Sequence, residues 1–598
     1  MKSSIPDELR DVANVQLAEI VAKLPTDAEG RFVLFVEVAR FLDYWSIFGH
    51  VAPFDRGFAS RDLDLLLWGW NEAVAHLFVP VEHVGGFPLM ESSLSSQRFA
   101  CHVLQEFGKV SLTRRLADMA ECGLLNIRRC DKGYIAQMAS EANAQFLDLL
   151  DVTQLQRTEE ELWTGGHGIE VAGWQIFDTR QVEAFVGKPQ SLLARAAPPV
   201  KGWLRDDLEE LMIPLIRPWD TGRGVMMAYG AREDLDKHYL AVALDQCTKW
   251  RSAAGMHPHA SFGQLTGEKI SAVVVVLASL HAKHIGFAGV ASRHFREISL
   301  PQSLTIWTER QELEASVSEL TGMSKHDVGL VFDAVCLRPH QAKRLHGHTT
   351  PFIPLLFDLG NGMVLRSPSC LTKNPFESIK QIQHWSDSRA EHVLAADREA
   401  WMRSDLYRLF MGRRYKCVDG SVKVRRGSDV VTDIDAAVYD KDTHDIGLFQ
   451  LKWQDYSTND VRQLTSKARN LAHELDQWSE KIGGWIDEAG TEKLGQTMRL
   501  NQRHGHRIRN VYLFGISQVS ARPEGYGHPI KGERIAVGTW SQFVRLRVEG
   551  GPATEVLGDL HAGLCASRSE TLATKPIPVT VTLGTVEIHL ENFWHDAD

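Results

Sequence analysis

The chain has 598 residues, more than one hydrophobic core can organise, so its length predicts about two to four domains. The net charge of -10 excludes a uniformly basic nucleic-acid coat, although a local basic groove remains compatible with it. The eight cysteines are scattered without a Cys-x-x-Cys pair, which excludes a zinc knuckle or disulfide framework and favours a reducing, cytoplasmic location.

Residues 1–95 are expected to form packed helices, because their apolar residues recur at three- and four-residue spacing. The first residues, MKSSIPDELRDVA, are polar and acidic and do not have the pattern of a signal peptide. These residues carry no recognisable chemistry, so the pattern predicts a helical region and no more.

Residues 96–150 combine helical stretches with a hairpin. Ser111 is expected to begin a second helix, Gly123 to end it, and the sequence around Asp131–Gly133 to turn the hairpin. This order is typical of a winged-helix module, but the residues favour a plainer alternative, a helix and hairpin packed on the next domain. In a winged helix, four arginines could face phosphates: Arg114, Arg115, Arg128 and Arg129.

Residues 151–385 are expected to form an α/β region of unknown role, suited to sensing or substrate recognition. The apolar run Ile270–Ala282 is too short to span a bilayer and is expected to form a buried helix, so no membrane association is expected. A hairpin is expected to turn at Gly360–Gly362. Phosphate-loop, nucleophile-elbow and kinase motifs are missing from the sequence.

Two groups of histidines in this region raise the question of a metal site. They are His257 with His259, and His340 with His346 and His348. A metal site needs converging ligands with a carboxylate or cysteine partner, and neither group has one nearby in the sequence. Surface or core histidines are therefore favoured.

Residues 386–525 begin with a charged helical stretch, EHVLAADREAWMRSDLYRLFMG, that Gly412 is expected to end. Two strands follow, Val430–Tyr439 and Ile446–Trp453, joined by the polar turn DKDTHD. A further helix and the strand VYLFGISQVS complete an α/β pattern.

Polar side chains recur on alternate positions of the two strands. Asp433 and Asp435 share one face of the first strand, and Gln450 and Lys452 share one face of the second. If the strands pair, carboxylate, amide and ammonium groups converge at one end of a sheet. Such groups are costly among apolar neighbours unless a cation or an anionic substrate lies between them.

Asp435 followed by Gln450-Leu451-Lys452 resembles the PD-(D/E)xK nuclease superfamily, which has the restriction-endonuclease-like fold. The resemblance covers about a quarter of the chain, roughly residues 391–522. Gln at the acidic position departs from the common motif and is similar to the Gln-x-Lys variant of Mrr-like restriction enzymes.

The resemblance implies a Mg²⁺ or Mn²⁺ ion held by oxygen ligands. The ligands would be Asp435 and Gln450, with the Leu451 backbone carbonyl, and Asp433 is the rival carboxylate. Lys452 would act on the attacking water and offset charge on the phosphate.

A carboxylate on the preceding helix would complete the implied catalytic set. Glu399 matches best by position, with Glu391 as the alternative, and either one could instead belong to a solvated helix face. Because Gln450 is neutral, the metal should be bound more weakly than in a site with Glu.

Basic residues flank the motif and indicate a polyanionic partner, although runs of like charge are often only solvated faces. The candidate nucleic-acid contacts are Arg413, Arg414, Arg425 and Arg426. A second group precedes the late strand: Arg499, Arg503, Arg507 and Arg509.

The sequence therefore predicts a metal-dependent nuclease that hydrolyses phosphodiester bonds, with DNA favoured over RNA as the partner. The resemblance implies a bacterial restriction or anti-phage defence effector, acting as a homo-oligomer or with a partner protein from a defence system. The alternatives are a catalytically inactive nucleic-acid-binding or scaffold protein of the same fold, and an RNA-directed nuclease.

Residues 526–598 are expected to be a β-rich tail that is either a small appendage or an extension of the nuclease-like sheet. The whole chain is thus predicted to be a mixed α/β, multidomain protein. A helical region, an α/β region and a restriction-endonuclease-like core would follow one another.

Overall fold

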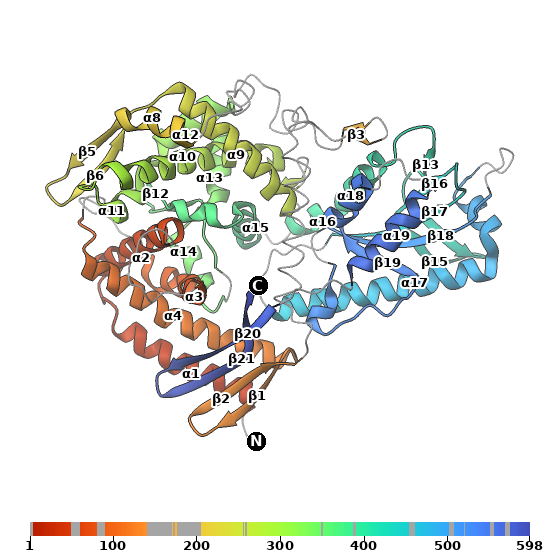
Figure 1. Ribbon diagram of the computed structural model, residues 1–598, viewed down its shortest axis with the longest axis horizontal. Helices are drawn as coiled ribbons and strands as arrows, with labels where there is room; N and C mark the ends of the chain where they lie inside the picture. The colour runs from red at the N-terminus through yellow and green to blue at the C-terminus, as the bar shows by residue number, and fades with distance from the viewer. Residues whose placement is uncertain are drawn as a thin grey trace.

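The computed structural model describes residues 4–49, 60–80, 90–139, 170–171, 174–175, 205–254, 256, 260–262, 264–348, 351–386, 390–453, 461–500, 507–518, 521–549, 555–568 and 574–597. The fold is mixed α/β with several small sheets, as the sequence predicts. Figure 1 shows two lobes: one contains the helices between Ile5 and Glu121 and between Arg205 and Ser386, with the last two strands of the chain beside the first helix, and the other contains a five-stranded sheet.

Four helices open the chain, and N-cap side chains begin three of them: Ser4, Asp27 and Ser93. The helices are α1 (Ile5–Ala22), α2 (Ala28–Phe48), α3 (Ser60–Leu77) and α4 (Leu94–Glu121). The helix α4 is continuous, so the predicted break at Ser111 is wrong, because Ser111 is buried inside the helix. Gly123, with φ of 76°, follows its end as predicted.

The middle of the chain adds helices and short strands. The helices are α8 (Arg205–Met212), η2 (Ile213–Leu215), α9 (Glu233–Ala253), α10 (Gly267–His294), α11 (Leu300–Leu304), α12 (Arg310–Thr321), α13 (Lys325–Val335), α14 (Pro339–Ala342), η3 (Lys343–Leu345), η4 (Pro368–Thr372) and α15 (Pro375–Ser386). Four strands pair in the order β10 (Cys336–Leu337), β11 (Leu356–Asp358), β12 (Met363–Arg366) and β9 (Ile306–Glu309). Hairpins elsewhere pair β3 (Glu170–Val171) with β4 (Trp174–Gln175), β5 (Ile216–Asp220) with β6 (Val225–Tyr229), and β7 (Ser261–Phe262) with β8 (Leu265–Thr266).

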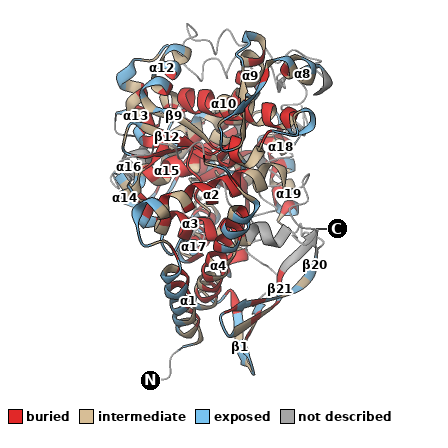
Figure 2. Cartoon of the chain, turned by 90° about the vertical axis from the view of Figure 1, so that its left-hand side faces the viewer, coloured by how far each residue is buried: buried red, intermediate tan, exposed pale blue. Residues whose placement is uncertain are grey.

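The opening helices and this middle region share one hydrophobic core, so the predicted boundary near residue 95 does not separate two cores. The Phe35 ring on α2 lies 5.3 Å from the Phe357 ring on β11. Trp70 Nε1 on α3 donates to the Phe352 carbonyl at 2.8 Å. Figure 2 shows how much of α2 and α10 is buried inside this lobe.

The apolar run predicted to form a buried helix does so within α10. Among the described residues, α10 is the one helix long and apolar enough to cross a membrane. About two thirds of its most apolar stretch is buried inside the protein, where it packs against α9, α12 and α13. Its composition is therefore explained by a place in the core.

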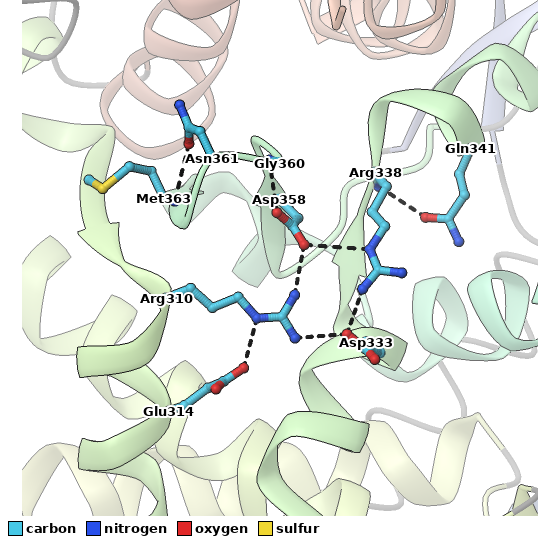
Figure 3. Close-up of polar contacts among 9 residues, drawn as sticks. All are labelled: Arg310, Glu314, Asp333, Arg338, Gln341, Asp358, Gly360, Asn361 and Met363. Carbon is cyan, nitrogen blue, oxygen red and sulfur yellow. Dashed lines mark hydrogen bonds and ion pairs between the residues drawn. The ribbon is translucent and has the colours of Figure 1, made fainter. Parts of the chain in front are cut away.

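Two arginines connect the hairpin of β11 and β12 to the helices beside it (Figure 3). The hairpin turns at Gly360–Gly362, as predicted. Arg310 donates to Asp358 and Asp333, each at 2.7 Å, and Arg338 donates to Asp333 at 2.6 Å. Each arginine spans two carboxylates with its planar guanidinium, which a single lysine ammonium could not do in the same geometry.

The predicted tail divides between two sheets: its first strand, β19 (Ile535–Thr539), extends the five-stranded sheet of the second lobe, whereas its last two strands do not. Its strands β20 (Thr574–Leu583) and β21 (Val586–Ala597) join the hairpin of β1 (Leu125–Cys130) and β2 (Gly133–Met138) in the order β1-β2-β21-β20. The pairing of β2 with β21 is parallel. Within the tail that was expected to be β-rich, Trp540–Glu549 forms the helix α18.

The second lobe is built on a five-stranded sheet in the order β13-β16-β17-β18-β19. Its strands are β13 (Tyr415–Cys417), β16 (Ala436–Asp440), β17 (Ile446–Lys452), β18 (Val511–Ser517) and β19 (Ile535–Thr539). A separate hairpin pairs β14 (Val422–Arg426) with β15 (Asp429–Ile434). The sheet reaches β19, so the unit continues past the predicted boundary at residue 525.

Helices cover both faces of this sheet, which explains why β17 is apolar on both of its faces. The helices are α16 (Ala390–Arg408), α17 (Val461–Thr497), α18 (Trp540–Glu549) and α19 (Val556–Ser567), beside the short η6 (Pro523–Tyr526). Phe449 and Leu451 face α16, α18 and α19, whereas Ile446 and Leu448 face α17. The predicted alternation of side chains along this strand is confirmed.

Candidate active site

Asp435 lies where the chain passes from one strand ladder to another. The predicted single strand Val430–Tyr439 is instead two strands, because β15 pairs with β14 whereas β16 joins the five-stranded sheet. Asp435 is the residue between them, and its backbone N–H donates to the Phe449 carbonyl of β17 at 3.1 Å. The bend therefore sets the Asp435 side chain against the C-terminal half of β17.

The Asp435 carboxylate is nearly buried, with 2% of the residue exposed. Its Oδ2 accepts the backbone N–H of Leu451 at 2.8 Å and the Nε2 of Gln450 at 2.6 Å. Both bonds reach the same oxygen, so Oδ1 takes part in neither. The structure thus brings together Asp435 and Gln450, which the sequence places on neighbouring strands.

Gln450 contributes an oxygen with no partner. Its Oε1 is buried and has no hydrogen bond within the described part of the chain. A buried amide oxygen without a donor is costly, by about 1–3 kcal/mol, and calls for an explanation. A cation beside Asp435 would supply one.

Lys452 lies two residues after Gln450 on the same face of β17, the face that α17 covers. Its Nζ lies 2.8 Å from a carboxylate oxygen of Glu474 on α17. Burial by itself would lower the pKa of the Lys452 ammonium, but Glu474 and Asp435 raise it above its usual value. Lys452 is therefore a positive charge held between two carboxylates.

The helix α16 brings Glu399 to the same end of the sheet. Arg403, one turn after Glu399, donates from its guanidinium to the Asp435 carbonyl at 3.0 Å. Arg398 lies over the Trp453 ring, with its guanidinium carbon 5.5 Å from the ring centroid. Glu399 itself is exposed, and the side chain of the alternative, Glu391, lies outside the described residues.

Asp433 lies beside Asp435 but is exposed, whereas Asp435 is buried. The indole of Trp478 on α17 donates to the Asp433 carbonyl at 2.8 Å, which fixes the backbone there. Burial, with the charges of Glu399 and Asp433, raises the pKa of the Asp435 carboxyl to about 7, against the opposing bond from Leu451. The Asp435 carboxyl is therefore protonated more readily than an ordinary aspartate.

The donor set fits a hard divalent cation. The Asp435 carboxylate contacts the Gln450 amide through Nε2, the same amide carries the unpartnered Oε1, and Asp433 and Glu399 bring two more carboxylates nearby. The fit makes Asp435 and Gln450 the residues that would hold such an ion. Lys452 has no place among the ligands because an ammonium has no lone pair to offer.

The predicted nucleic-acid contacts do not gather around this site. Arg414 binds the buried carboxylate of Asp440, with Nη2 2.7 Å from Oδ2, at the other end of β16 from Asp435. Five residues of strand separate the two ends, about 16 Å. Arg413 is exposed at that same far end.

Arg425 and Arg426 lie instead on the hairpin of β14 and β15, and both are exposed. Arg425 donates to the Ser428 carbonyl at 2.8 Å, and Arg426 pairs with Glu488 of α17. Of the second basic group, Arg503 lies outside the described residues. Arg507 and Arg509 both contact residues at the far end of β16 through their backbones.

Glu474 is the site residue that the sequence reasoning missed, whereas Arg403 belongs to the basic residues that precede the motif. Glu474 belongs to the helix after the motif, in the run LAHEL, where its apolar neighbours Leu471 and Leu475 mark the buried face. That spacing places Glu474 at the margin of the buried face, but which residue of the preceding strand it meets depends on how helix and sheet pack.

No family model matches this chain, and neither the curated proteins nor the solved structures include one that is significantly similar to it. The case for any function therefore rests on the arrangement of these residues.

Proposed function

We propose that this protein is a divalent-metal-dependent phosphodiesterase acting on nucleic acid, with its active site at Asp435, Gln450 and Lys452. The observation that carries the proposal is the buried contact between Asp435 and Gln450, with an unpartnered amide oxygen, beside a lysine. The succession of α16, β16, β17, α17 and β18, with β13–β15 after α16, adds support, because helix, strand, strand, helix, strand is the order that the resemblance to PD-(D/E)xK nucleases implies.

Each residue has a distinct role in this proposal. Asp435 and Gln450 hold Mg²⁺ or Mn²⁺, which when bound supplies Lewis-acid polarisation of the phosphate. Lys452 orients the attacking water and offsets the charge that grows on the phosphate. Glu474 positions Lys452 by its ion pair, and Glu399 and Asp433 raise the negative potential that attracts the cation.

DNA as the preferred substrate and a role in restriction or phage defence belong to the proposal through the same resemblance, and a cytoplasmic location belongs to it through the scattered cysteines. The helix α10 belongs to the protein core, so the proposal includes no membrane association.

A second candidate function rests on the same hydrogen bond. The Gln450 amide satisfies Asp435 Oδ2 at 2.6 Å without any cation, as it would in a relative that has lost the chemistry and only binds nucleic acid. An RNA-directed nuclease is a variant of the first candidate and shares its chemistry.

The deciding experiment is cleavage of plasmid DNA and of a structured RNA by the full chain, with Mg²⁺, with Mn²⁺ and with excess chelator. Cleavage should require the metal, and Asp435→Asn and Lys452→Ala should each lower its rate by at least about 100-fold. Asp442→Asn, an exposed acid beyond the far end of β16, is the matched control and should cleave like wild type.

Undiminished cleavage in chelator, or full activity of both active-site variants, would refute the proposal. Nucleic-acid binding that needs no metal and leaves the substrate intact would favour the second candidate.

A further inference from the structure

Three potential metal ligands meet in the first lobe, far along the chain from Asp435. Glu72 and His76 are one turn apart on α3, and His346 follows η3. One ligand atom from each lies within 4.8 Å of the others. The sequence reasoning dismissed His346 because no carboxylate lay near it in the chain, and the fold supplies one from 274 residues away.

Glu72 is fully buried, and its two oxygens have separate partners. Oε1 accepts from Arg114 at 2.5 Å and from the Gly347 backbone N–H at 2.8 Å. Oε2 therefore faces the imidazoles, 3.0 Å from His346 Nδ1 and 3.5 Å from His76 Nε2. Arg114 and Gly347 orient this carboxylate as outer partners orient ligands in known metal sites.

The two histidines differ in surroundings. The His76 ring stacks on Phe107 at 5.8 Å, and its Nε2 is buried without a hydrogen-bond partner among the described residues. The His346 side chain is 49% exposed, which leaves one side of the cluster open to water. The cluster thus combines a fixed carboxylate, an unpartnered imidazole nitrogen and a solvent-facing imidazole.

From this geometry we infer a zinc site formed by Glu72, His76 and His346, with water in the fourth position. Ligand atoms about 2.0–2.1 Å from a tetrahedral zinc lie roughly 3.4 Å apart, close to the 3.0 Å and 3.5 Å separations here. Two imidazoles select zinc or another first-row transition metal over magnesium.

The ion would join α3 to the segment around η3, because its ligands come from both. Asn71 already joins the same two segments, because its Nδ2 donates to the His348 carbonyl at 3.0 Å and its Oδ1 accepts the Phe352 N–H at 2.8 Å. A zinc ion one turn away would strengthen this junction. The role is structural and independent of the proposed nuclease chemistry.

The test uses the full chain carrying Asp435→Asn, which removes the other candidate metal site, with His346→Ala added. The control adds His340→Ala, an exposed histidine on α14 outside the cluster. After dialysis against Zn²⁺, the parent and the control should retain one more zinc per chain than His346→Ala. Added Zn²⁺, but not Mg²⁺, should raise their Tm by about 3 °C or more, and His346→Ala should lose that rise.

Equal zinc content and an equal thermal response in the parent and His346→Ala would overturn the inference. A His346→Ala variant that is less stable without zinc but responds to zinc like the parent would show that the cluster is only a hydrogen-bonded ion pair. His76→Asn, which removes the unpartnered nitrogen, should repeat the result of His346→Ala.

Discussion

A single amide decides between the two candidate functions. Gln450 presents Nε2 to Asp435 and keeps Oε1 buried and unpartnered, but its amide can turn over and offer the oxygen on the other side. With a cation in place, both Asp435 and Gln450 could direct oxygens to it. Without one, the amide N–H₂ replaces the cation as the partner of Asp435.

Gln450→Glu should distinguish these states. In the absence of metal the new carboxylate would face Asp435 Oδ2 across a 2.6 Å contact, and the repulsion should lower the thermal stability of the second lobe. Mg²⁺ should raise the Tm of the variant more than that of wild type, because the variant adds a charged ligand. Thermal unfolding of both proteins with and without Mg²⁺ measures this difference.

Gln463→Glu is the control, since Gln463 is exposed on α17 and carries the same change. A loss of stability in Gln450→Glu that Mg²⁺ does not restore would count against the metal site and in favour of the binding protein.

The residues of the site were predictable to different extents. Asp435, Gln450 and Lys452 could be found from sequence because side chains alternate along a strand and neighbouring strands align their ends. Glu474 could not, because its meeting with Lys452 depends on the angle at which α17 crosses the sheet. The unpartnered state of Gln450 Oε1 is likewise a property of packing and leaves no mark in the sequence.

At the scale of elements, β16 has a buried acid at each end. Asp435 precedes it, and Asp440, which ends it, is fully buried and is held by Arg414. The two acids look alike in sequence, yet one has an arginine partner and the other has only hydrogen bonds and a nearby lysine. The carboxylate without an arginine partner, that of Asp435, is the one suited to a cation.

Arg414→Ala should therefore destabilise the second lobe, by about 3 kcal/mol, because it leaves the Asp440 carboxylate buried and unpaired. Arg408→Ala should cost under about 1 kcal/mol, since Arg408 pairs with Asp405 at 3.4 Å with half of its side chain exposed. Urea unfolding followed by tryptophan fluorescence compares the two. Equal effects would mean that the Arg414 pair is no stronger than a surface pair.

The hairpin of β14 and β15 leads into Asp435 and carries the exposed Arg425 and Arg426 near its turn. Arg425→Gln with Arg426→Gln should weaken binding and reduce the log–log dependence of affinity on salt by about two units. Arg413→Gln with Lys416→Gln, at the far end of β16, should leave the slope closer to that of wild type. The opposite ranking would place the nucleic acid along the far end of the sheet.

The sequence predicted individual helices and hairpins better than it predicted which strands pair in a sheet. The buried helix α10 and the hairpin at Gly360–Gly362 follow from composition and turn residues, which act locally. The sheet that joins β2 to β21 could not be predicted, because an edge strand gives no local sign of which distant strand completes it.

At the scale of the whole molecule, buried polar contacts join the opening helices to the middle region. Asp43 on α2 is fully buried and accepts from Thr305, Ser367 and the backbone of Ser369, at 2.6–2.9 Å. Burial raises the pKa of the Asp43 carboxyl to about 6 despite these bonds. The first lobe therefore carries a titrating group at a junction between segments far apart in sequence.

This carboxyl should make the first lobe pH-sensitive. Because its folded pKa is above the unfolded value near 3.8, the stability it contributes is full below that value and is lost as pH rises through 6. Between pH 5 and pH 8, wild type should lose stability relative to Asp43→Asn by about 1.4 kcal/mol, because the unfolded carboxyl is already mostly ionised at pH 5. Unfolding midpoints of both proteins across that range measure the change, and a constant difference would contradict it.

The parallel pairing of β2 with β21 has a consequence for synthesis. Met138 donates to the side chain of Asn592, 454 residues later, so β2 is made long before its neighbour exists. At about 5–20 residues per second, the ribosome needs roughly half a minute or more to supply that neighbour. Until then the edge of β2 that β21 covers in the folded protein stays open to pairing with other strands.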